Sequence, residues 1–97
     1  MSKTLKILIA DDHQLIIDGI VSSLKEVGNF EIFSTTNCDD AFLKLKQKSF
    51  DILFTDLSFD DDTVSTKIDG GESLIKAIRK EEIPIKIAVI TGHSETN

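Results

Sequence analysis

A nearly continuous apolar run, Leu5–Ala10, lies close to the start of the chain and ends at two aspartates, Asp11 and Asp12. Such a run, without strict alternation of apolar and polar residues, is typical of a β-strand that is covered on both faces. Strands of this kind occur mainly in parallel sheets with helices packed on either side. The run therefore predicts an α/β fold.

The segments that follow alternate between helix and strand patterns. Apolar residues recur at helical spacing over Gln14–Val27, and Gly28 then supplies a stop signal. Asn37 is a predicted N-cap for a second helix, and Leu74 and Ile78 mark a third. Further strands are expected at residues 31–35, 52–55 and 85–91, the last after the break at Pro84. The alternation predicts βαβ units with right-handed crossovers and a doubly wound parallel sheet.

A third aspartate, Asp56, follows the apolar strand at residues 52–55. The carboxyl ends of parallel strands share one edge of a sheet, so Asp11, Asp12 and Asp56 are expected to converge there. A pocket of carboxylates suits a hard divalent cation. Because crowded carboxylates repel one another, at least one of them should have a raised pKa without a metal.

Length and charge narrow the class of protein further. The 97 residues suit one domain (1–97), and no apolar run approaches the roughly 20 residues that a membrane-spanning helix needs, so we expect a cytoplasmic protein. The net charge of -6, without a basic cluster, argues against direct binding of nucleic acid. The single cysteine, Cys38, precedes two acids that disfavour a thiolate, and we interpret it as a packing residue.

These features together resemble the receiver domain of bacterial two-component response regulators, across the whole chain. The subgroup that it resembles most controls a helix-turn-helix DNA-binding output domain, which this chain lacks. The resemblance implies a flavodoxin-like sheet of order 2-1-3-4, without the family's fifth strand and last helices. The segments that carry the resemblance are residues 7–13, Asp56, residues 69–72 and residues 88–92.

The resemblance also implies a function for the acidic pocket. Asp56 would be the phosphoacceptor, which takes a phosphoryl group from a phosphohistidine of a sensor histidine kinase. Mg²⁺ would be held directly by Asp12, Asp56 and the backbone carbonyl of Ser58, and through water by Asp11. The chain would promote its own Mg²⁺-dependent phosphorylation and dephosphorylation without being an enzyme that acts on other substrates.

Two further residues would contact the phosphoryl group by the same resemblance. The hydroxyl of Thr91 and the backbone N–H of Gly92 would donate to its oxygens. In the family, the threonine bond pulls the loop after the fourth strand inward and alters a distant surface. Phosphorylation would thus bias an element that has two states.

Each candidate residue also has a simpler structural explanation. Asp12 could only cap a helix, Asp56 could be an ordinary turn residue, and Thr91 suits a strand in any case. For His13, next to the pocket, a solvated position is favoured over a ligand role. The acidic run at residues 60–62 lacks the spacing of a calcium loop and is interpreted as solvated.

Two departures from the family pattern affect what is expected of this chain. Twelve residues without a proline separate Asp56 from Asp69, where the family has a short loop that carries a proline. The family's phosphate-contacting lysine belongs to a fifth strand that the chain does not contain. We therefore expect a receiver fragment in which the fourth strand has an uncovered edge, and association of two copies by pairing of that edge or by exchange of segments between chains is expected.

Two other functions remain as alternatives. One is a phosphorylation-independent interaction module built on a receiver fold, which the missing lysine favours. The other is a Mg²⁺-dependent phosphohydrolase of the haloacid dehalogenase type, which also uses an aspartate at a strand end. That family requires a second acid two residues later, but Ser58 stands there, so this alternative ranks last.

Overall fold

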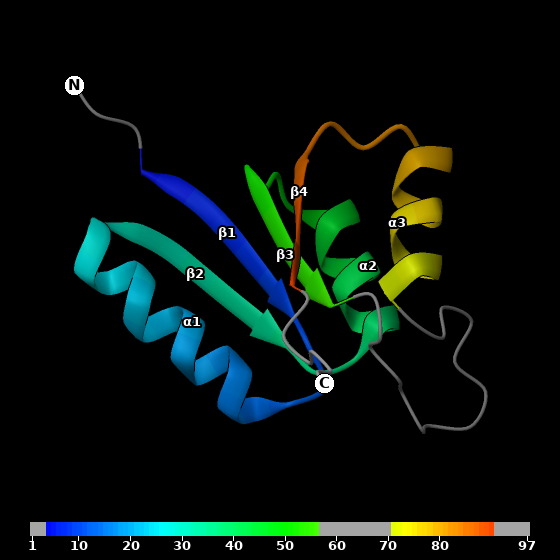
Figure 1. Cartoon of the computed structure of the whole chain (residues 1–97). Coiled ribbons are helices and arrows are strands. Elements are labelled where there is room, and N and C mark those ends of the chain that lie inside the picture. Colours follow the sequence, from blue (N-terminus) through cyan, green and yellow to red (C-terminus); the bar gives the residue numbers. More distant parts are fainter. Residues whose placement is uncertain (1–3, 57–70, 91–97) are drawn as a thin grey trace.

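The computed structural model describes residues 4–56 and 71–90, which form a parallel sheet between two helical layers (Figure 1). The expected alternation of strands and helices is confirmed for these residues. In chain order the elements are β1 (Leu5–Ala10), α1 (Gln14–Val27), β2 (Phe30–Thr35), α2 (Cys38–Gln47), β3 (Ile52–Asp56), α3 (Gly71–Lys80) and β4 (Lys86–Ile90).

The sheet has the order β2-β1-β3-β4, and every pair of neighbouring strands is parallel. This confirms the expected flavodoxin-like, doubly wound arrangement. Among the described strands β1 and β3 are central, while β2 and β4 form the two edges. The two acids that follow β1 and the one that ends β3 therefore lie at the middle of the sheet.

Side chains of β1 alternate between the two layers. Ile7 and Ile9 pack with Ile17 of α1, whereas Leu8 and Ala10 belong to the cluster formed with α2 and α3 on the other face. All five side chains are at most 1% exposed. This burial on both faces explains why β1 is apolar almost throughout, as expected for a central parallel strand.

Helix α2 starts as its sequence predicts. The side chain of Asn37 is the N-cap and accepts the backbone N–H of Asp40 at 2.8 Å. Asp39 and Asp40 lie in the first turn, and Lys44 lies in the last, so the charges complement the helix dipole. Helix α1 differs, because its N-cap residue is His13 rather than Asp12 and the His13 side chain makes no capping hydrogen bond.

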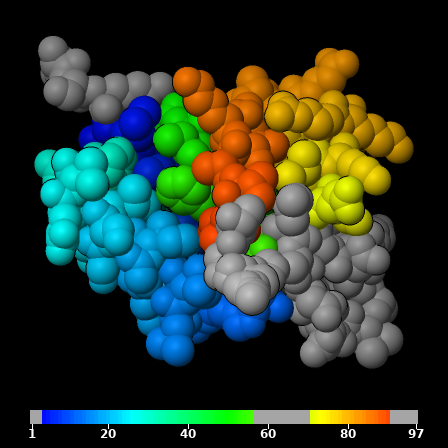
Figure 2. Space-filling model, in the orientation of Figure 1, coloured from blue at the N-terminus to red at the C-terminus, as the bar shows by residue number. Residues whose placement is uncertain are grey.

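Helix α1 is the only described helix on its face of the sheet, and it leaves part of β3 and β4 uncovered. Figure 2 shows β3, in green, between α1 and the orange strand β4. A groove of about 610 Å³ runs here, lined by Phe54 and Ala88 of the sheet and by apolar residues of α1. Leu15, 85% exposed, stands on its rim. This face therefore carries apolar surface.

Strand β4 begins at Lys86, one residue later than expected. Its ladder with β3 starts where Lys86 pairs with Ile52, and Ile85 precedes that first pair. The expected last residue of the strand, Thr91, lies outside the described residues, as does the loop at residues 57–69. Among the described helices, none has the length and apolar character needed to cross a lipid bilayer.

Candidate functional site

Strand register brings two of the predicted acids together. Ala10 of β1 pairs with Thr55 of β3, so Asp11, which follows β1, and Asp56, the last residue of β3, stand at the same level of the carboxyl edge. Their side chains are almost fully withdrawn from solvent, at 0% and 7% exposure. Buried carboxylates need a partner of opposite charge or a metal, so this pair marks the candidate site.

His13 completes a cluster that the sequence did not predict. One ligand atom each from Asp11, His13 and Asp56 lies within 4.8 Å of the other two. We call these three residues the Asp11–His13–Asp56 cluster. Asp12 joins it through His13, because its Oδ1 lies 2.9 Å from the ring Nδ1.

The turn after β1 explains the position of His13. Asp11 Oδ1 accepts the backbone N–H of His13 at 2.9 Å, which closes an Asx turn over the end of the strand. The same oxygen lies 3.2 Å from the ring Nδ1. The turn therefore folds the imidazole back onto the carboxylates, while 67% of its side chain stays exposed, as a solvated histidine requires.

Asp11 is the acid with the perturbed ionisation. Its pKa is raised above the ordinary value of 3.8, chiefly by burial, and the charges of Asp56 and Asp12 raise it further. Hydrogen bonds from His13 act in the opposite direction. The expectation of a raised pKa is confirmed for this residue, but repulsion between the acids is the smaller cause and burial the larger.

The pKa of His13 is raised as well. The largest cause is its hydrogen bond to the Asp11 carboxylate, followed by the charge of Asp12. The neighbouring acids therefore favour the protonated form of the His13 imidazole more than water does.

The cluster fits a divalent cation by its donor chemistry. Asp11 Oδ2 is buried and has no hydrogen-bond partner among residues 4–56 and 71–90. A buried carboxylate oxygen without a partner is costly, and a bound cation would satisfy it. Two buried carboxylates on adjacent strands are also the hard oxygen ligands that Mg²⁺ prefers.

Three predicted site residues fall outside the described part of the chain, namely Ser58, Thr91 and Gly92. The acidic run at residues 60–62 does too. Of the predicted set, the structure thus brings together Asp11 and Asp56, with Asp12 in contact with the same cluster through His13. His13 could have been suspected from sequence, because an aspartate two residues before a histidine permits the Asx turn.

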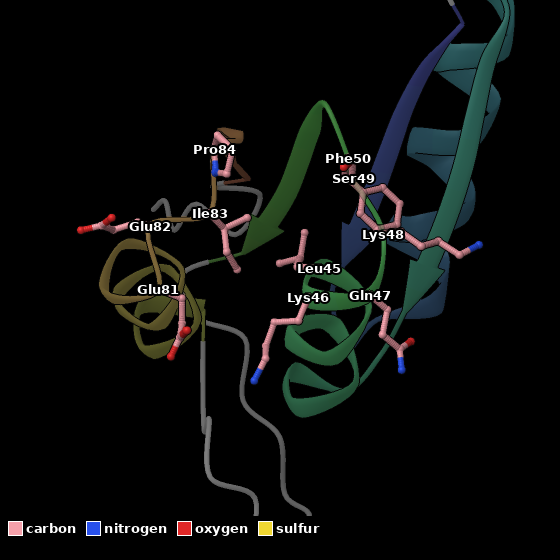
Figure 3. Close-up of a pocket in the computed structure, with 10 residues that line it drawn as sticks. All are labelled: Leu45, Lys46, Gln47, Lys48, Ser49, Phe50, Glu81, Glu82, Ile83 and Pro84. Atoms are coloured by element: carbon pink, nitrogen blue, oxygen red, sulfur yellow. The ribbon is translucent and has the colours of Figure 1, made fainter.

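A second hollow, of about 460 Å³, lies between the end of α2 with the residues that follow it and the segment that follows α3 (Figure 3). Its residues precede β3 and β4, so it opens at the amino ends of the strands, opposite the acids. Leu45 and Ile83 face one another inside it, while the side chains of Lys48 and Glu82 point away. Because its polar groups do not converge, it is a weaker candidate for a ligand site.

Residues 7–97 match the family described as response regulator receiver domain. No curated protein matched the chain.

Solved structures share the fold. A MaeR response regulator bound to beryllium trifluoride is 22% identical, with a TM-score of 0.77, and the match covers 95% of this chain and 70% of that one. A DNA-binding response regulator of the LuxR family from Staphylococcus aureus is 23% identical, with a TM-score of 0.77 over 94% of this chain and 71% of its own.

A third solved structure is RcsB from Salmonella enterica serovar Typhimurium, bound to the promoter rprA in the presence of phosphomimetic BeF3⁻. It is 28% identical, with a TM-score of 0.76, and the match covers 91% of this chain. The chain spans only 42% of that RcsB chain.

Proposed function

Because this chain belongs to the response regulator receiver domain family, we propose that residues 1–97 form the phosphoacceptor domain of a two-component response regulator. Asp56 accepts a phosphoryl group from a phosphohistidine of a sensor histidine kinase. The observation that carries the proposal is the pairing of Ala10 with Thr55, which sets Asp56 beside Asp11 at the carboxyl edge of the sheet.

Asp56 is the nucleophile in this proposal. One oxygen of its carboxylate forms the new O–P bond while the N–P bond of the donor breaks, and the imidazole leaves with the electron pair. The product is an acyl phosphate. A carboxylate is a weak nucleophile, so the reaction depends on in-line positioning and on neutralisation of negative charge rather than on the reactivity of Asp56 itself.

The cation that supplies this neutralisation is proposed to be Mg²⁺. Asp12, Asp56 and the Ser58 carbonyl would hold it directly, and Asp11 through water. When bound, Mg²⁺ offsets the charge of the carboxylates and of the phosphoryl oxygens. Within residues 4–56 and 71–90 the buried Oδ2 of Asp11 has no hydrogen-bond partner, which supports a cation at this edge.

Thr91 and Gly92 are proposed to hold the phosphoryl group from the side of β4. The Thr91 hydroxyl and the Gly92 N–H would donate to its oxygens, and glycine lets the backbone approach closely. Both follow directly after Ile90, which pairs with Asp56 at the end of the β3–β4 ladder. That register supports contact between this segment and the acceptor.

The wider role is proposed from the same family. The domain is cytoplasmic and acts on transcription through a helix-turn-helix output domain, so that DNA is a partner only through that domain. RcsB bound to a promoter is the relative that motivates this step. Acceptance and loss of the phosphoryl group are self-promoted, and no separate substrate is turned over.

Association of two copies is proposed along β4. It is an edge strand among the described strands, and unpaired strand edges can pair with another chain. Val89, on this strand, is 43% exposed. Light scattering at high protein concentration tests this, since a stable monomer would contradict it.

The phosphoacceptor role is tested by intact mass spectrometry. The chain is incubated with Mg²⁺ and a small phosphodonor, and wild type is compared with Asp56→Asn and Asp56→Ala. Wild type should gain the mass of one phosphoryl group, and both variants should gain none. Asp18→Asn is the matched control, because Asp18 is exposed on α1 and is not a member of the cluster, and it should leave the adduct unchanged.

Two outcomes would contradict the proposal. An adduct that survives in Asp56→Ala would place the acceptor elsewhere. No adduct in wild type, from a chain whose circular dichroism shows the native fold, would favour the phosphorylation-independent interaction module instead. Steady release of phosphate from phosphate esters would favour the phosphohydrolase.

A further inference from the structure

His13 is the member of the acidic cluster that the proposed function does not use. Its ring is exposed on one side, and on the other it meets the carboxylates of Asp11 and Asp12 through a single nitrogen, Nδ1. The Asx turn holds the backbone of His13 in place, since the same Asp11 oxygen accepts its N–H. The turn therefore holds the His13 ring between the carboxylates and solvent.

The distances around Nδ1 match those between ligands of one metal ion. Neighbouring ligand atoms of an octahedral ion with bonds of about 2.1 Å are about 3 Å apart, and opposite ones about 4.2 Å. Nδ1 lies 3.2 Å from Asp11 Oδ1 and 2.9 Å from Asp12 Oδ1. The Asp56 ligand atom belongs to the same group within 4.8 Å.

A second observation points to a cation at the same place. Asp11 is 0% exposed, and its Oδ2 has no hydrogen-bond partner in the part of the chain that the structure describes. The other oxygen of this carboxylate already contacts His13. The cluster therefore offers a buried oxygen that lacks a donor and a nitrogen close to it.

We propose that the imidazole of His13 is a further ligand of the metal that Asp12 and Asp56 hold directly and Asp11 holds through water, and that it shifts the preference of the site from Mg²⁺ toward Mn²⁺ and Co²⁺. The reason is the donor type, because imidazole suits first-row transition ions whereas Mg²⁺ takes oxygen ligands almost exclusively. The inference deepens the proposed function and rests on its metal site.

Ligation exchanges one contact for another. Without a metal, Nδ1 of the protonated ring donates a hydrogen bond to Asp11 Oδ1. A metal-bound Nδ1 would have released that proton to solvent, and its lone pair would serve as the ligand. Because 67% of the His13 side chain is exposed, the ring can adjust without disturbing the core.

The test measures nitrogen ligation directly. Mn²⁺ is added to the full chain, freed of any purification tag, in a buffer without nitrogen donors, and pulsed electron paramagnetic resonance records coupling to ¹⁴N. Wild type should show the coupling of one imidazole nitrogen, and His13→Gln should lose it. His93→Gln is the matched control, since His93 is the only other histidine in the sequence, and it should keep the signal.

Calorimetry supplies the second readout. His13→Gln should weaken Co²⁺ binding by about tenfold or more, the scale of losses at metal-site partners, while Mg²⁺ affinity stays close to that of wild type. Circular dichroism verifies that the variant folds. A ¹⁴N signal that survives in His13→Gln, or equal changes in Co²⁺ and Mg²⁺ affinity, would overturn the inference.

The two proposals fail in different ways. If wild type binds Mg²⁺, Asp56→Asn abolishes that binding and no nitrogen coupling appears, His13 is not a ligand while the metal site of the proposed function stands. If wild type binds none of the three ions, the metal site itself is refuted, and the role of His13 falls with it.

Discussion

Replacement of Asp11 by asparagine should stabilise the metal-free protein. Asn has the same shape and keeps an oxygen that can accept the backbone N–H of His13, now at 2.9 Å. It removes a negative charge from a side chain that is 0% exposed. The buried charge of Asp11 therefore destabilises the folded protein without a metal, and a bound cation should remove that destabilisation.

The size of this cost follows from the geometry of the cluster. The ligand atoms of Asp11 and Asp56 lie within 4.8 Å of one another. At an effective dielectric constant of about 20, two unit charges at that distance repel by about 3.5 kcal/mol. The hydrogen bonds from His13 offset part of this, so we expect Asp11→Asn to raise the free energy of unfolding by about 1–2 kcal/mol at neutral pH.

The effect of Asp11→Asn on the free energy of unfolding should depend on pH. The pKa of Asp11 is raised in the folded protein above its ordinary value of 3.8. The stabilisation from its protonated form is fully present below that value and is lost as the pH rises through the folded pKa. The difference between variant and wild type should therefore be near zero in acid, grow as the pH rises above 3.8 and then level off.

Urea unfolding followed by circular dichroism, with a chelator present, measures the difference in free energy of unfolding between Asp11→Asn and wild type at each pH. The sequence has no Trp or Tyr, so intrinsic fluorescence offers little signal. Saturating Mg²⁺ should reverse the order, because wild type gains about 2.7 kcal/mol at a hundred times the dissociation constant and the variant gains less. A variant that is less stable than wild type in chelator at neutral pH would refute the reasoning, and Asp18→Asn should change stability by less than about 0.5 kcal/mol.

Three further changes have defined outcomes. Because the pKa of His13 is raised in the folded protein, its protonated ring stabilises the fold below pH 6.5, and this stabilisation is lost as the pH rises through the folded pKa. NMR titration of His13 should show the raised pKa, and Asp11→Asn should lower that pKa. Asn37→Ala should cost about 1 kcal/mol in urea unfolding through loss of the cap on Asp40, whereas Asn37→Asp should restore most of it. Leu53→Ala, at a side chain that is 0% exposed, should cost about 2–5 kcal/mol, and a loss below about 1 kcal/mol would contradict the described core.

Most of the fold was predictable because the apolar pattern and the sheet agree. Within the run Leu5–Ala10, residues 7–10 are buried against helices on both faces of the sheet, which is why the apolar pattern located β1 correctly. The ends of other strands depend on hydrogen bonds between neighbouring strands, which an apolar pattern does not reveal. Phe30 joins β2 opposite Leu5, and Asp56 joins β3 opposite Ile90.

The candidate site was predictable only in part. Convergence of Asp11 and Asp56 follows from parallel strands alone, because their carboxyl ends share an edge. The position of the His13 ring depends on an Asx turn, which is a matter of local backbone geometry rather than of periodicity. The sequence also did not show that burial raises the pKa of Asp11 more than repulsion between the acids does, because burial depends on how the chain packs around the end of β1.

The match between Ala10 and Thr55 has a consequence for how this domain can vary. Successive side chains of a strand point to opposite faces, so an offset of one residue between β1 and β3 would carry Asp56 away from Asp11. A single-residue insertion or deletion within either strand should therefore erase the acidic site even where the domain still folds. The same edit in the turn before β4, around Glu82, leaves that alignment intact.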